Sequence, residues 1–105
     1  MEDNIVKVGS KFAISYSLAV AKKVELGMEE VILKARGQHI QKAVDASQIC
    51  VNRFLPNYEV KKVNIGTDKL KMNAVQDGKE ILRNVSWIEI TIVKKINTGM
   101  KDGLK

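Results

Sequence analysis

The chain has 105 residues, 45% of them hydrophobic and 29% charged, which suits one folded domain with one modest core. Its apolar runs fall far short of the ~20 residues that cross a bilayer, and its acidic start lacks the apolar stretch of a secretory leader. The single cysteine, Cys50, excludes an internal disulfide and a cysteine-based metal framework, and it fits a reducing, intracellular setting.

The charge of the chain is basic and unevenly placed. Eighteen Lys and Arg against twelve Asp and Glu give a net charge of +6, with residues 1–31 at −1 and residues 32–105 at +7. Such an excess favours a polyanionic partner. Composition alone is equally consistent with a soluble protein that is simply rich in lysine.

The first third of the chain predicts a strand, a helix and a second strand. Alternation over residues 4–8 indicates a short strand, and Ser10 is a good N-cap for a helix that runs to Leu26. Gly27 stands where a left-handed residue ends a helix. The apolar residues 31–33 predict a strand that Gly37 ends.

A second helix is predicted over residues 38–54 and is ended by Pro56, because the residue before a proline is disfavoured from helical geometry. A helix in a monomeric two-layer domain needs one apolar face. This helix carries a stripe at helical spacing, widened by further apolar residues: Ile40, Ala43, Val44, Ser47, Val51 and Phe54, then Ala46, Ile49, Cys50 and Leu55. The surplus predicts a surface buried in a homodimer.

Two strands are predicted in the last half of the chain. The alternation over residues 58–65 slips between Lys61 and Lys62, as a β-bulge would produce, and residues 88–93 alternate clearly. Between them, residues 68–83 hold few large apolar groups and should project as an arm that turns at Asp77-Gly78. Residues 96–105 have no apolar period and are expected to be a flexible tail.

The predicted order is β-α-β-α-β-β, an α+β fold in which two helices cover one face of a four-stranded mixed sheet. We expect a single domain over residues 1–105, with an ordered core over about 4–95.

No catalytic constellation is present. His39 and Cys50 are eleven residues apart on one predicted helix, so roughly 16 Å separates them and excludes a Cys–His pair within one chain. One histidine and one cysteine also offer no recognisable metal-ligand spacing. We therefore expect no enzyme activity, no cofactor and no metal site.

Basic residues stand instead at the junctions between elements. Lys11 precedes the first helix, and Lys34 and Arg36 lie between the second strand and the second helix. Both junctions of a β-α-β unit lie at the same end of the sheet, where the N–H groups of two helix starts suit phosphate oxygens. Gly37 would let a nucleic-acid backbone come close.

Five segments carry a family resemblance: Val-Gly-Ser-Lys at 8–11, Ile-Leu-Lys-Ala-Arg-Gly at 32–37, and residues 40–45, 52–56 and 85–90. In this order and spacing they resemble the Alba family of archaeal chromatin proteins, over about residues 4–95. The resemblance implies a fold like the C-terminal domain of translation initiation factor three with a protruding β-hairpin arm. It also implies a homodimer that binds double-stranded DNA, and in many relatives RNA, without strong sequence preference.

The resemblance also implies roles for particular residues. Nucleic-acid binding falls to Lys11, Lys34, Arg36, Gly37 and Gln38, with Lys69, Lys71, Lys79 and Arg83 in the arm. Side-by-side association of dimers on DNA falls to Asn52, Arg53 and Phe54.

Three positions depart from the family pattern. Ser10 replaces the lysine that is regulated by acetylation, which leaves neighbouring Lys11 as the possible modification site, and Gln38 replaces an arginine. These losses predict weaker or more salt-sensitive duplex binding than in a fully basic relative. Trp87 is unusual at its place, and we expect core or interface packing for it rather than stacking on an unpaired base.

The favoured function is a homodimer that coats or compacts double-stranded DNA through basic loops and arms, associated with the nucleoid in the cytoplasm and without a membrane partner. The alternative is an RNA-binding protein, an RNA chaperone or a ribonucleoprotein subunit. A structural dimer with incidental basic charge would show salt-independent behaviour toward nucleic acid.

Overall fold

The computed structural model describes residues 3–76 and 79–96, with the side chains of residues 3–71 and 82–96. Its elements in chain order are β1 (Ile5–Lys7), α1 (Ala13–Glu25), β2 (Glu30–Arg36), η1 (Gly37–His39), α2 (Ile40–Ile49), η2 (Cys50–Phe54), β3 (Tyr58–Gln76) and β4 (Lys79–Lys94). The predicted turn at Asp77-Gly78 and the tail from residue 97 onward lie outside the described residues.

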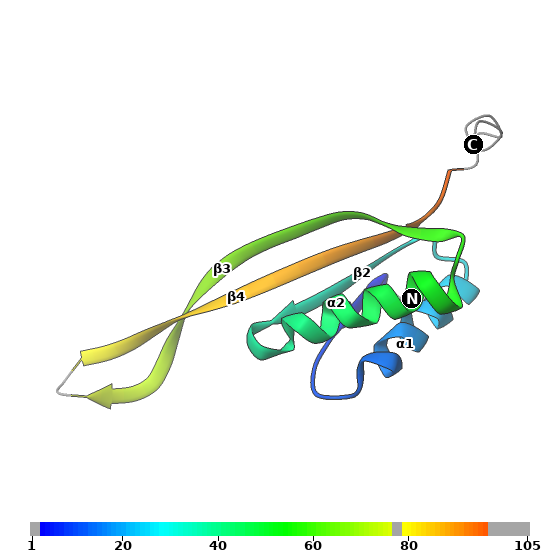
Figure 1. Ribbon diagram of the computed structural model, residues 1–105. Coiled ribbons are helices and arrows are strands. Elements are labelled where there is room, and N and C mark those ends of the chain that lie inside the picture. The colour runs from blue at the N-terminus through cyan, green and yellow to red at the C-terminus, as the bar shows by residue number, and fades with distance from the viewer. Residues whose placement is uncertain (1–2, 77–78, 97–105) are drawn as a thin grey trace.

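The four strands form one mixed sheet in the order β1-β2-β4-β3. β1 runs parallel to β2, whereas β4 is antiparallel to both of its neighbours, β2 and β3. Figure 1 shows α1 and α2 on one face of this sheet, with the other face left open. The predicted α+β fold is confirmed.

The core lies between the sheet and the two helices. Strand alternation places Val31 and Leu33 of β2 beside Ile90 and Ile92 of β4 on the covered face, and all four are buried. The helices add their own buried residues to this layer: Tyr16, Ser17 and Val20 from α1, and Ala43, Ala46 and Ser47 from α2. The predicted alternation of residues 88–93 is therefore confirmed.

The start of α1 differs from the prediction. The helix begins at Ala13 with Phe12 as its N-cap, so Ser10 lies in the preceding loop and caps nothing. The hydroxyl of Tyr16 accepts the backbone N–H groups of Gly9 at 2.9 Å and Lys11 at 3.1 Å. A buried tyrosine one turn into the helix thus satisfies two backbone N–H groups of the loop in which Ser10 lies. Gly27 has φ +104, as its predicted place at the helix end requires.

The second predicted helix is composite rather than uniform. It opens with a 3₁₀ turn, continues as α2 and ends in a π turn, η2, in which the N–H of Leu55 donates to the carbonyl of Cys50 at 2.8 Å. Leu55 itself leaves helical geometry directly before Pro56, as predicted.

Much of the apolar surplus on this helix is used within the chain. Ala46 and Cys50 are fully buried because α2 packs against α1 as well as against the sheet; the hydroxyl of Ser17 donates to the Ala46 carbonyl at 2.8 Å. Among the exposed apolar residues of the covered face are Val44, 40% exposed, and Val63 and Ile65 of β3, 51% and 75% exposed. Uncovered apolar surface therefore lies on β3, and on and beside α1, rather than all along α2.

The arm is the continuation of the last two strands. β3 and β4 stay paired well beyond the end of β2, where Arg36 pairs with Trp87, and Figure 1 shows the two strands running out as a twisted ribbon. The molecule consequently measures 66 × 27 × 25 Å. The predicted bulge is confirmed, since Lys61 has no partner in β4 and the register shifts between Val60 and Lys62.

Candidate nucleic-acid interface

Three basic segments meet at one end of the sheet. The parallel pairing of β1 and β2 brings the loop that carries Lys11 to the same end as Arg36 and Gly37, and the ribbon of β3 and β4 leaves the body there (Figure 1). Gly37 adopts φ +55, a conformation that a glycine reaches without strain. Lys11, Arg36, Gly37 and Gln38 are all exposed. The structure therefore brings the predicted junction residues together.

The loop that carries Lys11 is held by Tyr16. Two backbone N–H groups of the loop point at one phenolic oxygen, so the Lys11 backbone is held while its side chain stays exposed. Sequence reasoning missed this positioning role of Tyr16. The available signal was a tyrosine on the buried face of a helix, where a phenolic oxygen needs a polar partner.

Arg36 and Lys34 each face a carboxylate of the same sheet. A guanidinium nitrogen of Arg36 lies 2.9 Å from a carboxylate oxygen of Asp68, and Lys34 Nζ lies 3.3 Å from Glu89. The Arg36 and Asp68 side chains are 58% and 41% exposed, so water screens their ion pair, which contributes only about 0–1 kcal/mol. A phosphate oxygen can therefore replace either carboxylate at small cost.

A hollow of about 700 Å³ lies beside these pairs. Its lining includes the cations Lys7, Lys34 and Arg36, the acids Asp68 and Glu89, and the residues His39 and Trp87. Trp87 is only partly buried and lines the hollow rather than the core, so the expected packing in the core is wrong, whereas packing at an interface stays a prediction. The reason is register, because Trp87 pairs with Arg36 and Gly66 on the open face of the sheet.

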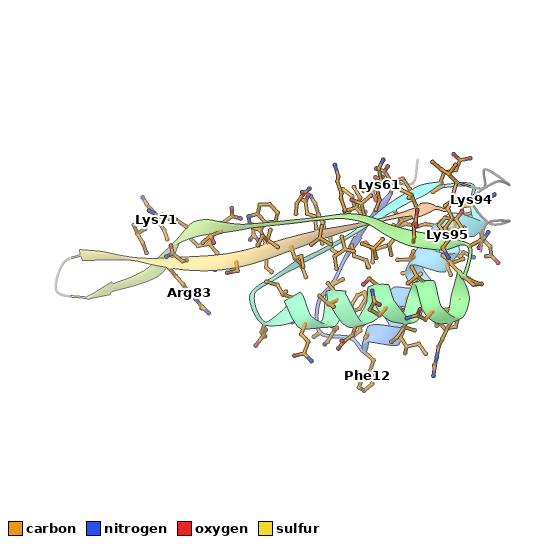
Figure 2. The ribbon with its side chains drawn as sticks, turned by 45° about the horizontal axis from the view of Figure 1, so that its top comes forward. Phe12, Lys61, Lys71, Arg83, Lys94 and Lys95 are labelled. Atoms are coloured by element: carbon orange, nitrogen blue, oxygen red, sulfur yellow. The ribbon has the colours of Figure 1, made fainter. Side chains whose placement is uncertain are left out.

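The arm divides its basic residues between two faces. Leu70 pairs with Arg83, and Lys71 pairs with Leu82, so alternation puts Lys69 and Lys71 on one face and Arg83 on the other. Figure 2 shows Lys71 and Arg83 on the ribbon, well away from the helices and pointing to opposite sides. The side chain of Lys79 lies outside the described residues.

A separate group of predicted residues follows α2 at its far end. Asn52 and Arg53 are exposed and Phe54 is half-buried in the π turn, roughly 22–25 Å along the helix from Gly37. The structure does not bring them to the junction site. Figure 2 also shows three exposed lysines that sequence reasoning missed, Lys61, Lys94 and Lys95, at the end of the sheet opposite the arm.

The described residues offer little for other chemistry. Burial raises the pKa of the Cys50 thiol to about 11, which keeps it protonated and unreactive. Within residues 3–76 and 79–96, no three His, Cys, Asp or Glu side chains are grouped so that they could hold a metal ion. In the same part of the chain, no helix is long and apolar enough to cross a membrane.

Comparison with known proteins places this architecture in one family. The Alba family model matches residues 4–67. The chain is 44% identical over 93 residues to the DNA/RNA-binding protein Alba of Methanococcus maripaludis, covering 88% of this chain and 99% of that protein. It is 41% identical over 95 residues to DNA/RNA-binding protein Alba 1 of Archaeoglobus fulgidus, covering 90% of this chain and all of that protein.

A solved structure agrees with the sequence matches. Alba from Thermoplasma volcanium superposes with a TM-score of 0.74 at 35% identity, covering 87% of this chain and all of the other. On the evidence of sequence, topology and three-dimensional likeness, the chain belongs to the Alba family.

Proposed function

We propose that this chain is a homodimeric nucleic-acid-binding protein that coats or compacts double-stranded DNA with little sequence preference. The observation that carries the proposal is the meeting of the Lys11 loop, the Arg36-Gly37 junction and the root of the arm at one end of the sheet. The relatives named as DNA/RNA-binding proteins support it. The protein acts by charge and shape and performs no reaction.

In this proposal the body of the protein contacts phosphates. Lys11, Lys34 and Arg36 donate to phosphate oxygens, Gln38 adds a neutral donor, and Gly37 lets the sugar-phosphate backbone approach. The arms follow the minor groove, whose two walls are phosphate backbones. Basic side chains on both faces of the ribbon, Lys69 and Lys71 against Arg83, suit contact with both walls, and we include Lys79 among them.

The dimer surface is proposed on the covered face beside α2. Val63 and Ile65 extend past the helices on β3, and Val44 lies exposed on α2. Exposed apolar side chains that gather on one face are typical of a subunit interface. Two copies joined there would present two body sites and two arms to one duplex.

Residues 1–105 form a single domain, and Asn52, Arg53 and Phe54 join neighbouring dimers on DNA, away from the junction site. Lys11 is the possible modification site, where loss of charge would weaken phosphate contact. The protein would be associated with the nucleoid in the cytoplasm. An RNA-binding role, as a ribonucleoprotein subunit or an RNA chaperone, is the alternative.

The test is charge reversal at the junction. Arg36→Glu should lower affinity for a short DNA duplex at least ~10-fold and reduce the salt slope by roughly 0.9 per lost phosphate contact, about 1.8 per dimer. Lys95→Glu is the matched control, because it makes the same charge change at an exposed residue at the far end of the sheet. Titrations across a salt series measure both quantities, and circular dichroism checks the fold.

Equal losses in the two variants would mean that only overall charge matters, and the proposed site would be wrong. If wild-type protein binds neither duplex DNA nor RNA at 0.15 M salt, the proposed function fails as a whole.

A further inference from the structure

The hollow beside Arg36 contains a feature that duplex binding does not use. Trp87, the only tryptophan of the chain, lines it on the open face of the sheet and is partly exposed. Contacts to duplex phosphates need cations and hydrogen-bond donors and make no use of the face of an aromatic ring. An aromatic ring among cations is instead the arrangement that binds single-stranded nucleic acid.

The indole is held in place by the glycine opposite it. Gly66 pairs with Trp87 across the ladder between β3 and β4, and the ring lies against the Gly66 backbone. A β-carbon at residue 66 would stand 2.6 Å from Cε2 and 3.0 Å from Nε1 of the ring, closer than side chains pack. The strand backbone therefore supports the ring, so a base that stacks on it need not order it first.

The charges around the ring suit a nucleotide. Lys7, Lys34 and Arg36 supply donors for a phosphate, while Asp68 and Glu89 can accept from the amino groups of a base. The volume of about 700 Å³ is within the range of small-ligand sites. A base inside a duplex is stacked between its neighbours and cannot enter such a hollow, whereas an unpaired base can.

We propose that this hollow binds one unpaired nucleotide of a single-stranded nucleic acid, with its base stacked on Trp87 and its phosphate held by Arg36. The inference deepens the proposed function and rests on it, because Arg36 serves both ligands. Trp87 is then the residue that separates single-strand binding from duplex binding. DNA and RNA strands share the required chemistry, a base with an adjacent phosphate.

Trp87 also reports on its own site, since the chain has no other tryptophan. Titration of the wild-type protein with a twelve-residue thymidine oligonucleotide should quench its fluorescence, and an abasic strand of equal length and charge should bind about 5- to 100-fold more weakly. A uridine oligoribonucleotide forms the second arm. Tighter binding of the ribonucleotide strand would identify RNA as the source of the unpaired base, and tighter binding of thymidine would identify DNA.

The variant Trp87→Leu separates the two ligands. Measured by fluorescence anisotropy of labelled strands, it should lose about 5- to 100-fold in affinity for the thymidine strand and less than twofold for a duplex. Equal affinity of wild-type protein for abasic and base-bearing strands would overturn the inference, even if the variant failed to fold. That result together with normal duplex binding would leave the proposed function intact, whereas absent duplex binding would count against the proposed function itself.

Discussion

The guanidinium of Arg36, which is proposed to bind phosphate, already forms an ion pair with Asp68 at 2.9 Å. The carboxylate keeps the guanidinium oriented toward the open face and competes with any incoming anion. Lys34 stands in the same relation to Glu89. Affinity at the proposed site would therefore be a balance between internal carboxylates and external phosphates.

Removing the competing acid should strengthen binding. Asp68→Asn frees Arg36 and adds one positive charge per chain, so we expect a gain of up to about fivefold in duplex affinity, in line with the ~1 kcal/mol limit for an exposed pair. The gain should shrink as salt rises, because salt screens the attraction between Arg36 and Asp68 that the substitution removes. Duplex titrations at two salt concentrations measure it.

Glu59→Gln provides the comparison for that experiment. It makes the same charge change at an exposed residue that pairs with Val93, near the end of the sheet away from the arm. An equal gain in both variants would show that net charge, rather than release of Arg36, raises the affinity.

Among the side chains that the structure describes, the Cys50 thiol has a shifted pKa that sets a pH dependence. Burial raises the pKa of its thiol from an ordinary 9.0 to about 11, so the folded state keeps the proton while the unfolded state loses it. This contribution to stability is complete below pH 9 and is lost as pH rises from 9 to 11, by about 2 kcal/mol. Urea unfolding of wild type and Cys50→Ala should show their stability difference shifting by that amount in favour of the variant. A constant difference across the window would contradict it.

Some residues of the interface were predictable and others were not. The position of Arg36 and Gly37 at the candidate interface was predictable because a junction after a strand and before a helix has a definite place in a β-α-β unit. Asp68 was not predicted as a partner of Arg36, since their pairing spans 32 residues and depends on sheet register. The expected core packing of Trp87 was wrong for the same reason, because its face follows from its pairing with Gly66.

At the scale of elements, the arm is a strand pair with two chemically different faces. Lys69 and Lys71 share one face and Arg83 has the other, and the ladder to the body is continuous through β4. The sequence indicated an arm because residues 68–83 lack a core-forming pattern. It did not indicate that the two strands of the body continue into the arm. Without a buried face, the arm residues lack the apolar alternation by which a strand is recognised.

The two faces of the arm can be tested separately. The double variant Lys69→Gln, Lys71→Gln should lower the duplex salt slope by about 1.8 per arm, and Arg83→Gln by about 0.9, if each side chain neutralises one phosphate. Lys94→Gln, Lys95→Gln is the control at the far end of β4, where no loss is expected. A slope unchanged by both arm variants would remove the arm from the duplex interface.

The composite second helix shows a similar limit. Pro56 made its end predictable, but the π turn before it depends on how Cys50 and Leu55 pack against the rest of the core. Periodicity alone counted Ala46 and Cys50 as spare apolar surface. Their burial against α1 required the packing of two helices to be known.

For the whole molecule, the proposed dimer surface on β3 would decide whether two arms act together. Val63 and Ile65 are more than half exposed although both lie on the covered face of the sheet. A homodimer joined there would bury them and double the number of phosphate contacts made in one binding event.

A charge on that face should separate the subunits. Ile65→Asp is expected to convert a dimer into an 11.7 kDa monomer, because a carboxylate buried without a partner opposes association. Sedimentation equilibrium measures the mass. Ile96→Asp is the matched control, since Ile96 is 77% exposed beyond the end of β4 and should leave the dimer intact. A dimer that persists in Ile65→Asp would place the interface elsewhere.

The bulge at Lys61 acts on the arm from a distance. Before the bulge, the even-numbered residues Tyr58 and Val60 lie on the covered face of the sheet. The extra residue shifts the alternation by one, so after the bulge the odd-numbered residues Val63 and Ile65 lie on that face. The β3 residues from Lys62 to Lys71 keep that parity, including Gly66 beside Trp87 and the two arm lysines. Deleting Lys61 would either slide the strand along β4 or invert its two sides. One extra residue in the body thus decides which face of the arm carries its lysines, although the arm begins several residues later. Insertions or deletions at this position in homologues should therefore coincide with rearranged arm sequences.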